Sequence, residues 1–163
     1  MALEPLHIVV RAASLLPAGR ALDIACGRGR NAVWLTQQGW RVIAIDIDPH
    51  VTPEPSPTLE VRIMDLEKSL PSFDDGSFDL IVMTHYFQPS LFPFVRRWLR
   101  DGGVLVTSAK MSGRFAAAAG ELSSAFSEWE VIHVFEDGMI SELIARRRSP
   151  QRHRESTEIA ETP

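Results

Sequence analysis

The sequence predicts an α/β protein: a three-layer α/β/α sandwich around a mostly parallel seven-stranded sheet, with an antiparallel hairpin at its carboxyl end. Three observations predict this fold. Short apolar runs alternate with amphipathic segments along the chain. A glycine-rich turn joins the first apolar run to the amphipathic segment that follows it. Two apolar runs near the carboxyl end flank the polar turn 136–138, which is typical of a hairpin.

The first elements read as helix, strand, helix and strand. Apolar side chains recur every three or four positions over 3–16, which predicts an amphipathic helix that ends before Pro17. The apolar runs 20–25 and 42–45 predict the first two strands. The amphipathic segment 30–38 between them predicts the helix that follows the glycine-rich turn.

The interval 49–58 separates the second strand from the third, which we expect at 59–63. This interval contains Pro49, Pro53, Pro55 and Pro57. Proline lacks an amide donor and clashes with a helical backbone. We therefore expect a shortened crossover that is extended or turn-like, where a helix is usual.

The remaining elements complete the sheet. The apolar run 78–83 is broken by Asp79 alone, as in a strand buried on both faces, and we expect Asp79 to be a structural partner of the glycine-rich turn. Segment 90–99 predicts a helix despite Pro93 near its start. The other predicted elements are a strand at 104–108, a partly helical segment at 115–126 and hairpin strands at 129–135 and 141–146.

The composition fits one globular domain. With 45% hydrophobic and 23% charged residues, a chain of 163 residues can bury a sizeable core. We expect this domain over 1–147 and a disordered tail over 148–163, because the tail is polar and lacks apolar periodicity. The net charge of −4 gives no indication of a nucleic-acid partner.

Several other classes of protein find no support. No apolar stretch reaches the roughly 18 residues of a membrane span, and the amino terminus lacks a signal-peptide layout, so we expect no membrane partner. Cys26 is the single cysteine, which excludes an intrachain disulfide and agrees with a cytoplasmic location. The five histidines show no metal-ligand spacing, and we expect no metal.

The stretch Asp23-Ile24-Ala25-Cys26-Gly27-Arg28-Gly29 carries the most chemical information. Glycine has no Cβ, so Gly27 and Gly29 let a ligand approach the main chain where the first strand ends. Asp46, at the tip of the second strand, follows Gly27 at the spacing of about 20 residues expected of an acid that binds ribose hydroxyls. These features predict a site for an adenosine-containing ligand.

The same turn also matches a dinucleotide fingerprint, since 27–32 reads G-x-G-x-x-A. Asp23 argues against a dinucleotide, because a carboxylate near this turn repels a diphosphate and attracts a sulfonium or an ammonium group. S-adenosylmethionine carries both cations and no phosphate, so we favour it over NAD. A role of Asp23 as a cap or ion-pair partner is the alternative, but a carboxylate inside an apolar strand is costly unless it is satisfied.

Three blocks resemble the class I S-adenosylmethionine-dependent methyltransferases: ALDIACGRGRNAVWLTQQGWRVIAIDID (21–48), IMDLEKSLPSFDDGSFDLIVM (63–83) and LRDGGVLV (99–106). Within that superfamily, CGRGRNAVWLTQQG resembles the tellurite-resistance methyltransferases and their small-molecule relatives. The resemblance covers roughly 15–145 and implies a Rossmann-like fold with S-adenosylmethionine as the cofactor. The shortened crossover, and a segment 109–120 that is shorter than usual, depart from the family pattern.

The resemblance also implies roles for residues at the strand ends. Asp23 and the turn from Ala25 to Gly29 would face the amino-acid end of the donor. Asp46 would bind the ribose, and Asp65 would accept a hydrogen bond from the adenine amino group. The cofactor-binding residues implied in this way are Asp23, Ala25, Cys26, Gly27, Gly29, Asn31, Asp46, Ile47, Met64, Asp65, Leu66, Thr84 and His85.

His85, Tyr86 and Arg30 are the catalytic candidates. His85 follows the fourth strand and is either a general base or a satisfied polar residue at the cleft. Tyr86 either forms part of an aromatic pocket wall or covers the core. Arg30 either binds an anionic substrate or points to solvent. We expect Cys26 to be a small apolar filler and not a nucleophile.

Together these features predict methyl transfer from S-adenosylmethionine to a small molecule or a small oxyanion. One alternative is a protein that binds the donor without catalysis, as a sensor or a partner subunit. A nicotinamide-dependent oxidoreductase is the other. The sequence names neither the acceptor nor the oligomeric state, and a second subunit could cover the proline-rich edge.

Overall fold

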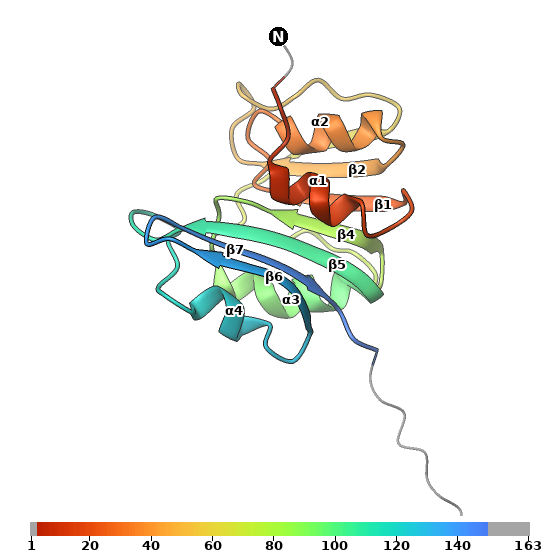
Figure 1. Ribbon diagram of the computed structural model, residues 1–163. Helices are drawn as coiled ribbons and strands as arrows, with labels where there is room; N and C mark the ends of the chain where they lie inside the picture. Colours follow the sequence, from red (N-terminus) through yellow and green to blue (C-terminus); the bar gives the residue numbers. More distant parts are fainter. Residues whose placement is uncertain (1–2, 150–163) are drawn as a thin grey trace, which may run out of the picture.

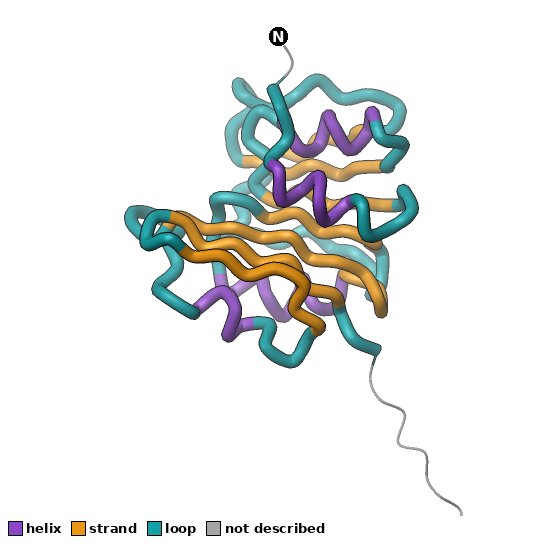
Figure 2. Tube along the Cα trace, viewed as in Figure 1, coloured by secondary structure: helices purple, strands orange, loops and turns teal. Residues whose placement is uncertain are grey.

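The structure, a computed structural model, describes residues 3–149. Its centre is a seven-stranded sheet. The strands are β1 (Arg20–Ile24), β2 (Arg41–Asp46), β3 (Leu59–Ile63), β4 (Phe78–Met83), β5 (Leu99–Lys110), β6 (Glu130–Glu136) and β7 (Ile140–Arg146). They lie in the order β3-β2-β1-β4-β5-β7-β6 (Figures 1 and 2). The first five pair in parallel, and β7 is antiparallel to both β5 and β6.

Helices cover both faces of the sheet. They are α1 (His7–Ala13), α2 (Arg30–Gln37), the 3-10 helix η1 (Pro89–Leu91), α3 (Phe92–Trp98) and α4 (Glu121–Ala125). Helices α1 and α2 lie on one face, and α3 and α4 lie on the other (Figure 1). The predicted three-layer sandwich with its antiparallel carboxyl-terminal hairpin is therefore confirmed.

The side chains of β1 point alternately to the two faces of the sheet, and the core accordingly has two apolar layers. Leu22 and Ile24 point toward α3 and α4, where the aromatic side chains Phe92, Trp98 and Phe126 are buried. Ala21 points toward α1 and α2 and packs in the layer that contains Val9 and Leu35. Each layer buries residues from several elements at once, so the sheet order is held by packing as well as by hydrogen bonds.

The place of β1 in the sheet determines where a ligand can bind. The chain passes from β1 to β2 on one side and later to β4 on the other side. Open α/β sheets bind ligands in the crevice that forms at such a switch, outside the carboxyl ends of the strands. The carboxyl end of β1 leads directly into the glycine turn, which we define as residues 25–29.

Several predicted boundaries were wrong. Helix α1 begins only at His7. The residue before Pro5 is restricted to extended backbone, and Leu6 is also extended, with ψ 138. The segment 90–99 divides into η1 and α3, with Pro93 in the first turn of α3, where no amide donor is needed. Strand β5 is longer than 104–108 on both sides, since Leu99 also pairs with Phe78 of β4 and Ala109 and Lys110 also pair with β7. Within 115–126 only Glu121–Ala125 is helical.

The shortened crossover is confirmed, because the segment 47–58 contains turns and bends and no helix. Asx turns shape its first part. The Asp48 N–H donates to Asp46 Oδ1 at 3.0 Å, and the His50 N–H donates to Asp48 Oδ1 at 2.8 Å. The predicted tail falls mostly on 150–163, which lie outside the described residues.

The prediction that Asp79 partners the glycine turn was wrong. Asp79 lies near the start of β4, at the opposite end of the sheet, because parallel strands place their amino ends together. Its Oδ2 accepts the Arg20 N–H at 2.8 Å, and its Oδ1 pairs with Arg100. A Cβ on Gly19 would lie 2.2 Å from Asp79 Oδ2, so Gly19 leaves room for this carboxylate.

We therefore predict that Asp79→Ala lowers the free energy of unfolding by about 1–3 kcal/mol, because it removes a charge-assisted acceptor at the start of β1. Urea titration measures the change. Asp75→Ala is the matched control, since the Asp75 pair with Arg97 is exposed and contributes at most about 1 kcal/mol. Equal effects of the two substitutions would contradict the assignment.

Candidate functional site

Two neighbouring cavities open at the carboxyl ends of the strands, and both are lined by Ala25. The first has a volume of about 250 Å³ and the second about 400 Å³. Ala25 has φ 57, a left-handed backbone that is uncommon for a residue with a Cβ. Strained backbone of this kind clusters at ligand sites. The glycine turn thus separates two spaces that one elongated ligand could occupy together.

Hydrogen bonds fix the glycine turn against β2. The Cys26 N–H donates to the Ile45 carbonyl at 2.9 Å, and the Gly27 N–H donates to Asp46 Oδ2 at 2.9 Å. Gly29 then begins α2 with φ 78, a conformation that suits glycine. A Cβ on Gly27 would meet no atom within 4 Å, so Gly27 leaves its main chain open to a ligand.

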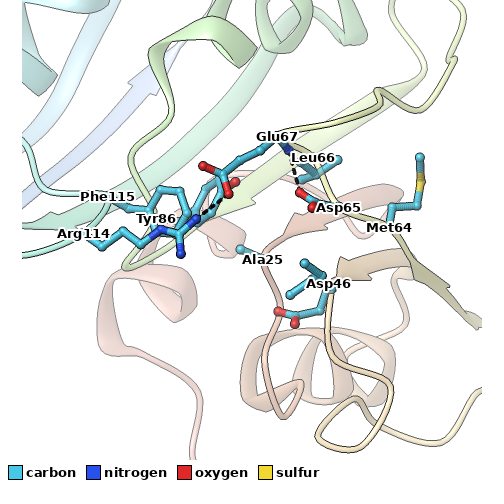
Figure 3. A pocket seen from close by; sticks show the side chains of 10 residues that line it. Ala25, Asp46, Met64, Asp65, Leu66, Glu67, Tyr86, Arg114 and Phe115 are labelled. Atoms are coloured by element: carbon cyan, nitrogen blue, oxygen red, sulfur yellow. Dashed lines mark hydrogen bonds and ion pairs between the residues drawn. The ribbon is translucent and has the colours of Figure 1, made fainter.

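The first cavity lies between the ends of β2 and β3 and the loop after β5 (Figure 3). Asp46 and the residues after β3 form one side, and Tyr86 and Phe115 form the other, with their rings 4.5 Å apart. Arg114 and Glu67 form an ion pair of 2.6 Å at its rim. The residues that line it are Ala25, Asp46, Ile47, Met64, Asp65, Leu66, Glu67, Tyr86, Arg114 and Phe115.

Two carboxylates of this cavity differ in what they already bind. Asp46 accepts backbone N–H groups at both oxygens and braces the glycine turn while it faces the cavity. Asp65 caps the turn that follows β3, where its Oδ1 accepts the Glu67 N–H at 3.0 Å. Each carboxylate oxygen can accept more than one hydrogen bond, so both groups keep capacity for a ligand hydroxyl or amine. Ile47 is 60% exposed at the edge of the cavity.

The second cavity is lined by polar and basic groups as well as by the amino-terminal segment. Its residues are Leu3, Leu6, Ala25, Cys26, Gly27, Arg28, Arg30, Asn31, Thr84 and His85. Arg28 and Arg30 are exposed, and none of the residues from 3 to 149 that line this cavity is acidic. The second cavity therefore favours a ligand portion that carries negative charge.

Asn31 connects three elements around the second cavity. Its Oδ1 accepts the Leu6 N–H at 2.9 Å, and its Nδ2 donates to Thr84 Oγ1 at 3.3 Å. Its side chain is 4% exposed. Asn31 thus holds the amino-terminal segment beside the glycine turn and the end of β4, and its amide is engaged within the protein.

Asp23 lies beneath the glycine turn and lines neither cavity. It is 1% exposed, and neither carboxylate oxygen accepts a hydrogen bond from the described residues. Burial raises the pKa of Asp23 to about 8, against a smaller lowering by the nearby Ala32 N–H, and the Asp46 charge raises it further. Near pH 7 this carboxyl group is therefore largely protonated.

His85 and Tyr86 follow β4 and line different cavities. His85 has φ 54, and its N–H donates to Ser108 Oγ at 3.0 Å, which turns its ring toward the second cavity. Partial burial lowers the pKa of the His85 imidazole, and the charges of Arg30 and Lys110 lower it further. The neutral ring can accept a proton. Burial raises the pKa of the Tyr86 hydroxyl to about 12, which argues against Tyr86 as a base.

Cys26 and Gly29 are the remaining candidate residues of the glycine turn. Cys26 is buried in an apolar cluster, and burial raises the pKa of its thiol, so it fills space as expected. Gly29 is buried and lines neither the first nor the second cavity. Among the residues from 3 to 149, no group of three potential metal ligands gathers. Within the same range, no helix has the length and apolar character to cross a bilayer.

The sequence did not single out several lining residues. These are Leu3, Leu6, Arg28, Glu67, Arg114 and Phe115. Leu3 and Leu6 appeared only as apolar positions of a helix, and their place beside the glycine turn depends on tertiary contacts. Phe115 has φ 58 and stacks on Tyr86 from a loop that no periodicity marks. Its aromatic character, two residues after Gly113, was the one available signal.

The residues around the two cavities fit an adenosyl ligand with an amino-acid tail. Acidic groups that can accept from hydroxyls and amines border the first cavity, and basic groups that suit a carboxylate border the second. The unpartnered Asp23 carboxyl lies below the turn between them. A buried group of this kind is costly until a donor or a cation partners it.

Comparison with known proteins agrees with this reading. The methyltransferase domain family matches residues 22–107, which is more than half of the chain. A probable S-adenosyl-L-methionine-dependent methyltransferase of Haemophilus influenzae, TehB, is 25% identical over 149 residues, or 79% of this chain and 52% of TehB. An uncharacterized methyltransferase of Synechocystis sp. is 30% identical over 100 residues, or 56% of this chain and 47% of that protein.

Solved structures show the same fold. The crystal structure of TehB from H. influenzae superposes with a TM-score of 0.75 at 19% identity, covering 88% of this chain and 63% of TehB. The 1,6-didemethyltoxoflavin-N1-methyltransferase of Burkholderia thailandensis, with bound 1,6-didemethyltoxoflavin and S-adenosylhomocysteine, superposes with a TM-score of 0.66 at 16% identity. The superposition covers 87% of this chain and 77% of that protein. The chain spans about half the length of the curated relatives it matches.

Asp23→Asn tests the protonation of this buried group. An acid whose pKa is raised by folding loses stability as the pH rises from its unfolded pKa of about 3.9 toward its folded pKa. We predict that the wild type loses about 2–3 kcal/mol relative to Asp23→Asn between pH 5 and pH 7. Urea unfolding of both proteins at the two pH values measures this difference. A constant difference would show that Asp23 is ionised throughout.

A titration of the imidazole signals by NMR tests the environment of His85. We predict an apparent pKa below the ordinary value of 6.5, because partial burial and nearby positive charges disfavour the imidazolium. Lys110→Gln removes one of these charges and raises the pKa toward 6.5. A pKa at or above 6.5 in the wild type, or no response to Lys110→Gln, would refute this electrostatic description.

Proposed function

The chain belongs to the methyltransferase domain family, and from this membership we propose that it transfers a methyl group from S-adenosylmethionine to a small-molecule acceptor. The observation that carries the proposal is the pair of cavities joined across Ala25, with acceptors for a nucleoside on one side and basic groups on the other. We assign this activity to a domain over 1–147 and place it in the cytoplasm.

The nucleoside end of the donor would occupy the first cavity. Asp46 would accept from the ribose hydroxyls while it continues to brace the Gly27 amide. Asp65 would accept from the adenine amino group, with Met64 and Leu66 around the ring. Ile47 is 60% exposed, and its side chain would be buried against the adenine base. Burial of this apolar surface would favour binding.

The amino-acid end of the donor would lie over the glycine turn in the second cavity. The open face of Gly27 allows the close approach that this position requires. Arg28 or Arg30 would pair with the carboxylate of the donor. Asp23 beneath the turn would lose its proton when the cationic portion of the ligand arrives, since a nearby positive charge lowers the pKa of a carboxyl group.

S-adenosylmethionine supplies an activated methyl group on a sulfonium. The protein then has to align the acceptor and exclude water, and it needs a base only where the acceptor carries a proton on the attacking atom. His85 is the base that we assign for such an acceptor, because its ring is neutral at pH 7 and lines the second cavity. An acceptor without that proton needs no base.

The second cavity is larger than the first, with about 400 Å³ against about 250 Å³, and therefore has space for a small acceptor beside the donor tail. Its basic lining favours acceptors with negative charge. We therefore propose a small anion, including an oxyanion, as the acceptor, in keeping with the resemblance to tellurite-resistance methyltransferases. Arg30 would attract it and His85 would lie beside it.

Calorimetric titration with S-adenosylhomocysteine tests the donor site. We predict that the wild type binds it and that Asp46→Ala weakens the binding by about 10- to 100-fold, which corresponds to about 1.4–2.7 kcal/mol, because both the ribose acceptor and the brace of the turn are lost. Asp101→Ala, an exposed carboxylate paired with Arg147, is the control. Equal affinities of the Asp46→Ala and wild-type proteins would exclude this placement of the donor.

A further inference from the structure

The two glycines of the turn face different surroundings. A Cβ on Gly27 would meet nothing within 4 Å. A Cβ on Gly29 would lie 2.5 Å from Cγ of Pro53 and 3.0 Å from its Cβ and Cδ. The position that a side chain would take at Gly29 is therefore filled by Pro53, a residue of the shortened crossover.

This contact falls where a dinucleotide site needs free space. In the fingerprint G-x-G-x-x-A the second glycine lets the main chain approach the pyrophosphate, which sits at the start of the following helix. Gly29 is that second glycine, and it caps α2. Here the protein's own chain fills the space on the Cβ side of Gly29.

Pro53 is held in this place by the chain of turns that leads from the donor site. Asp46 caps the turn at Asp48, Asp48 caps the turn at His50, and the Thr52 hydroxyl donates to the Pro49 carbonyl at 3.4 Å. The proline ring also restricts its own backbone. Figure 1 shows the crossover between β2 and β3 running alongside α2. The contact with Gly29 thus follows from a sequence of local constraints.

Charge alone does not exclude a diphosphate from this turn. Arg28 and Arg30 flank Gly29 and would attract phosphate groups. The buried Asp23 carboxyl is largely protonated near neutral pH and repels an anion only weakly in that state. Pro53 adds a steric obstacle at the turn, and such an obstacle distinguishes a nucleoside from a nucleoside diphosphate.

We propose that Pro53 is a specificity-determining residue, which closes the glycine turn to nucleotides that carry a diphosphate and leaves it open to the nucleoside donor. The inference rests on the proposed function, since it concerns the same donor site. It assigns selection against dinucleotides to the shape of the crossover and not to a fixed charge in β1.

The test compares two ligands on the full chain by calorimetric titration: S-adenosylhomocysteine and ADP-ribose, an adenosine with a diphosphate. We expect the wild type to bind S-adenosylhomocysteine and to bind ADP-ribose at least about 100-fold more weakly. Pro53→Gly should raise the affinity for ADP-ribose by about tenfold or more and change that for S-adenosylhomocysteine by less than about threefold.

Pro55→Gly is the matched control. It relaxes the same crossover, but the three atoms nearest to the Gly29 Cβ position all belong to Pro53. It should leave both affinities close to those of the wild type. Pro53→Ala is the second variant. It removes Cγ, the atom nearest to the Gly29 position, and retains more backbone restriction than glycine, so it decides the outcome if Pro53→Gly does not fold.

The inference is overturned if folded Pro53 variants bind S-adenosylhomocysteine and still fail to gain ADP-ribose binding, or if Pro55→Gly gains it equally. It is also overturned if the folded variants lose both ligands, since Pro53 would then support the turn instead of excluding phosphate. A wild type that binds no S-adenosylhomocysteine would refute the proposed function separately.

Discussion

The site depends on the parallel pairing that places the end of β1 between the ends of β2 and β4. Ile24 lies opposite Ile45 on one side and opposite Met83 on the other. The next residues of the chain therefore meet the tip of β2, where Cys26 and Gly27 donate to Ile45 and Asp46. Without this register the glycine turn would have no partner that holds its amides. Both cavities, the brace from Asp46 and the position of the segment after β4 follow from it.

The buried carboxyl group in β1 shows how the fold accepts a local cost below the glycine turn. Asp23 occupies a place in the apolar layer between the sheet and the helices where a hydrocarbon side chain would be more stable. Its neutral form is the less costly one, and its charged form becomes favourable when a positive group comes near.

Much of this arrangement could be predicted from the sequence, for identifiable reasons. The strands at 59–63 and 78–83 were predicted with their observed bounds. For 78–83 the reason is that a strand buried inside a parallel sheet is a nearly continuous apolar run. The glycine turn and Asp46 were recognisable because their chemistry depends on residue type at fixed spacing.

The parts that were missed depend on contacts between distant segments. Phe115 reaches Tyr86 from a loop without periodicity, and Asp79 pairs at the end of the sheet opposite to the one expected. The raised pKa of Asp23 was not predicted either, because its size depends on how completely the folded chain buries the side chain. Burial, more than identity, sets the pKa of such a group.

A crystal structure with S-adenosylhomocysteine bound tests the central claim most directly, namely that one nucleoside ligand spans both cavities across Ala25. We predict that its ribose hydroxyls lie within hydrogen-bond distance of Asp46, that its adenine lies between Ile47 and Leu66, and that its amino-acid end lies over Gly27. A ligand confined to one cavity, or bound away from the glycine turn, would contradict this account.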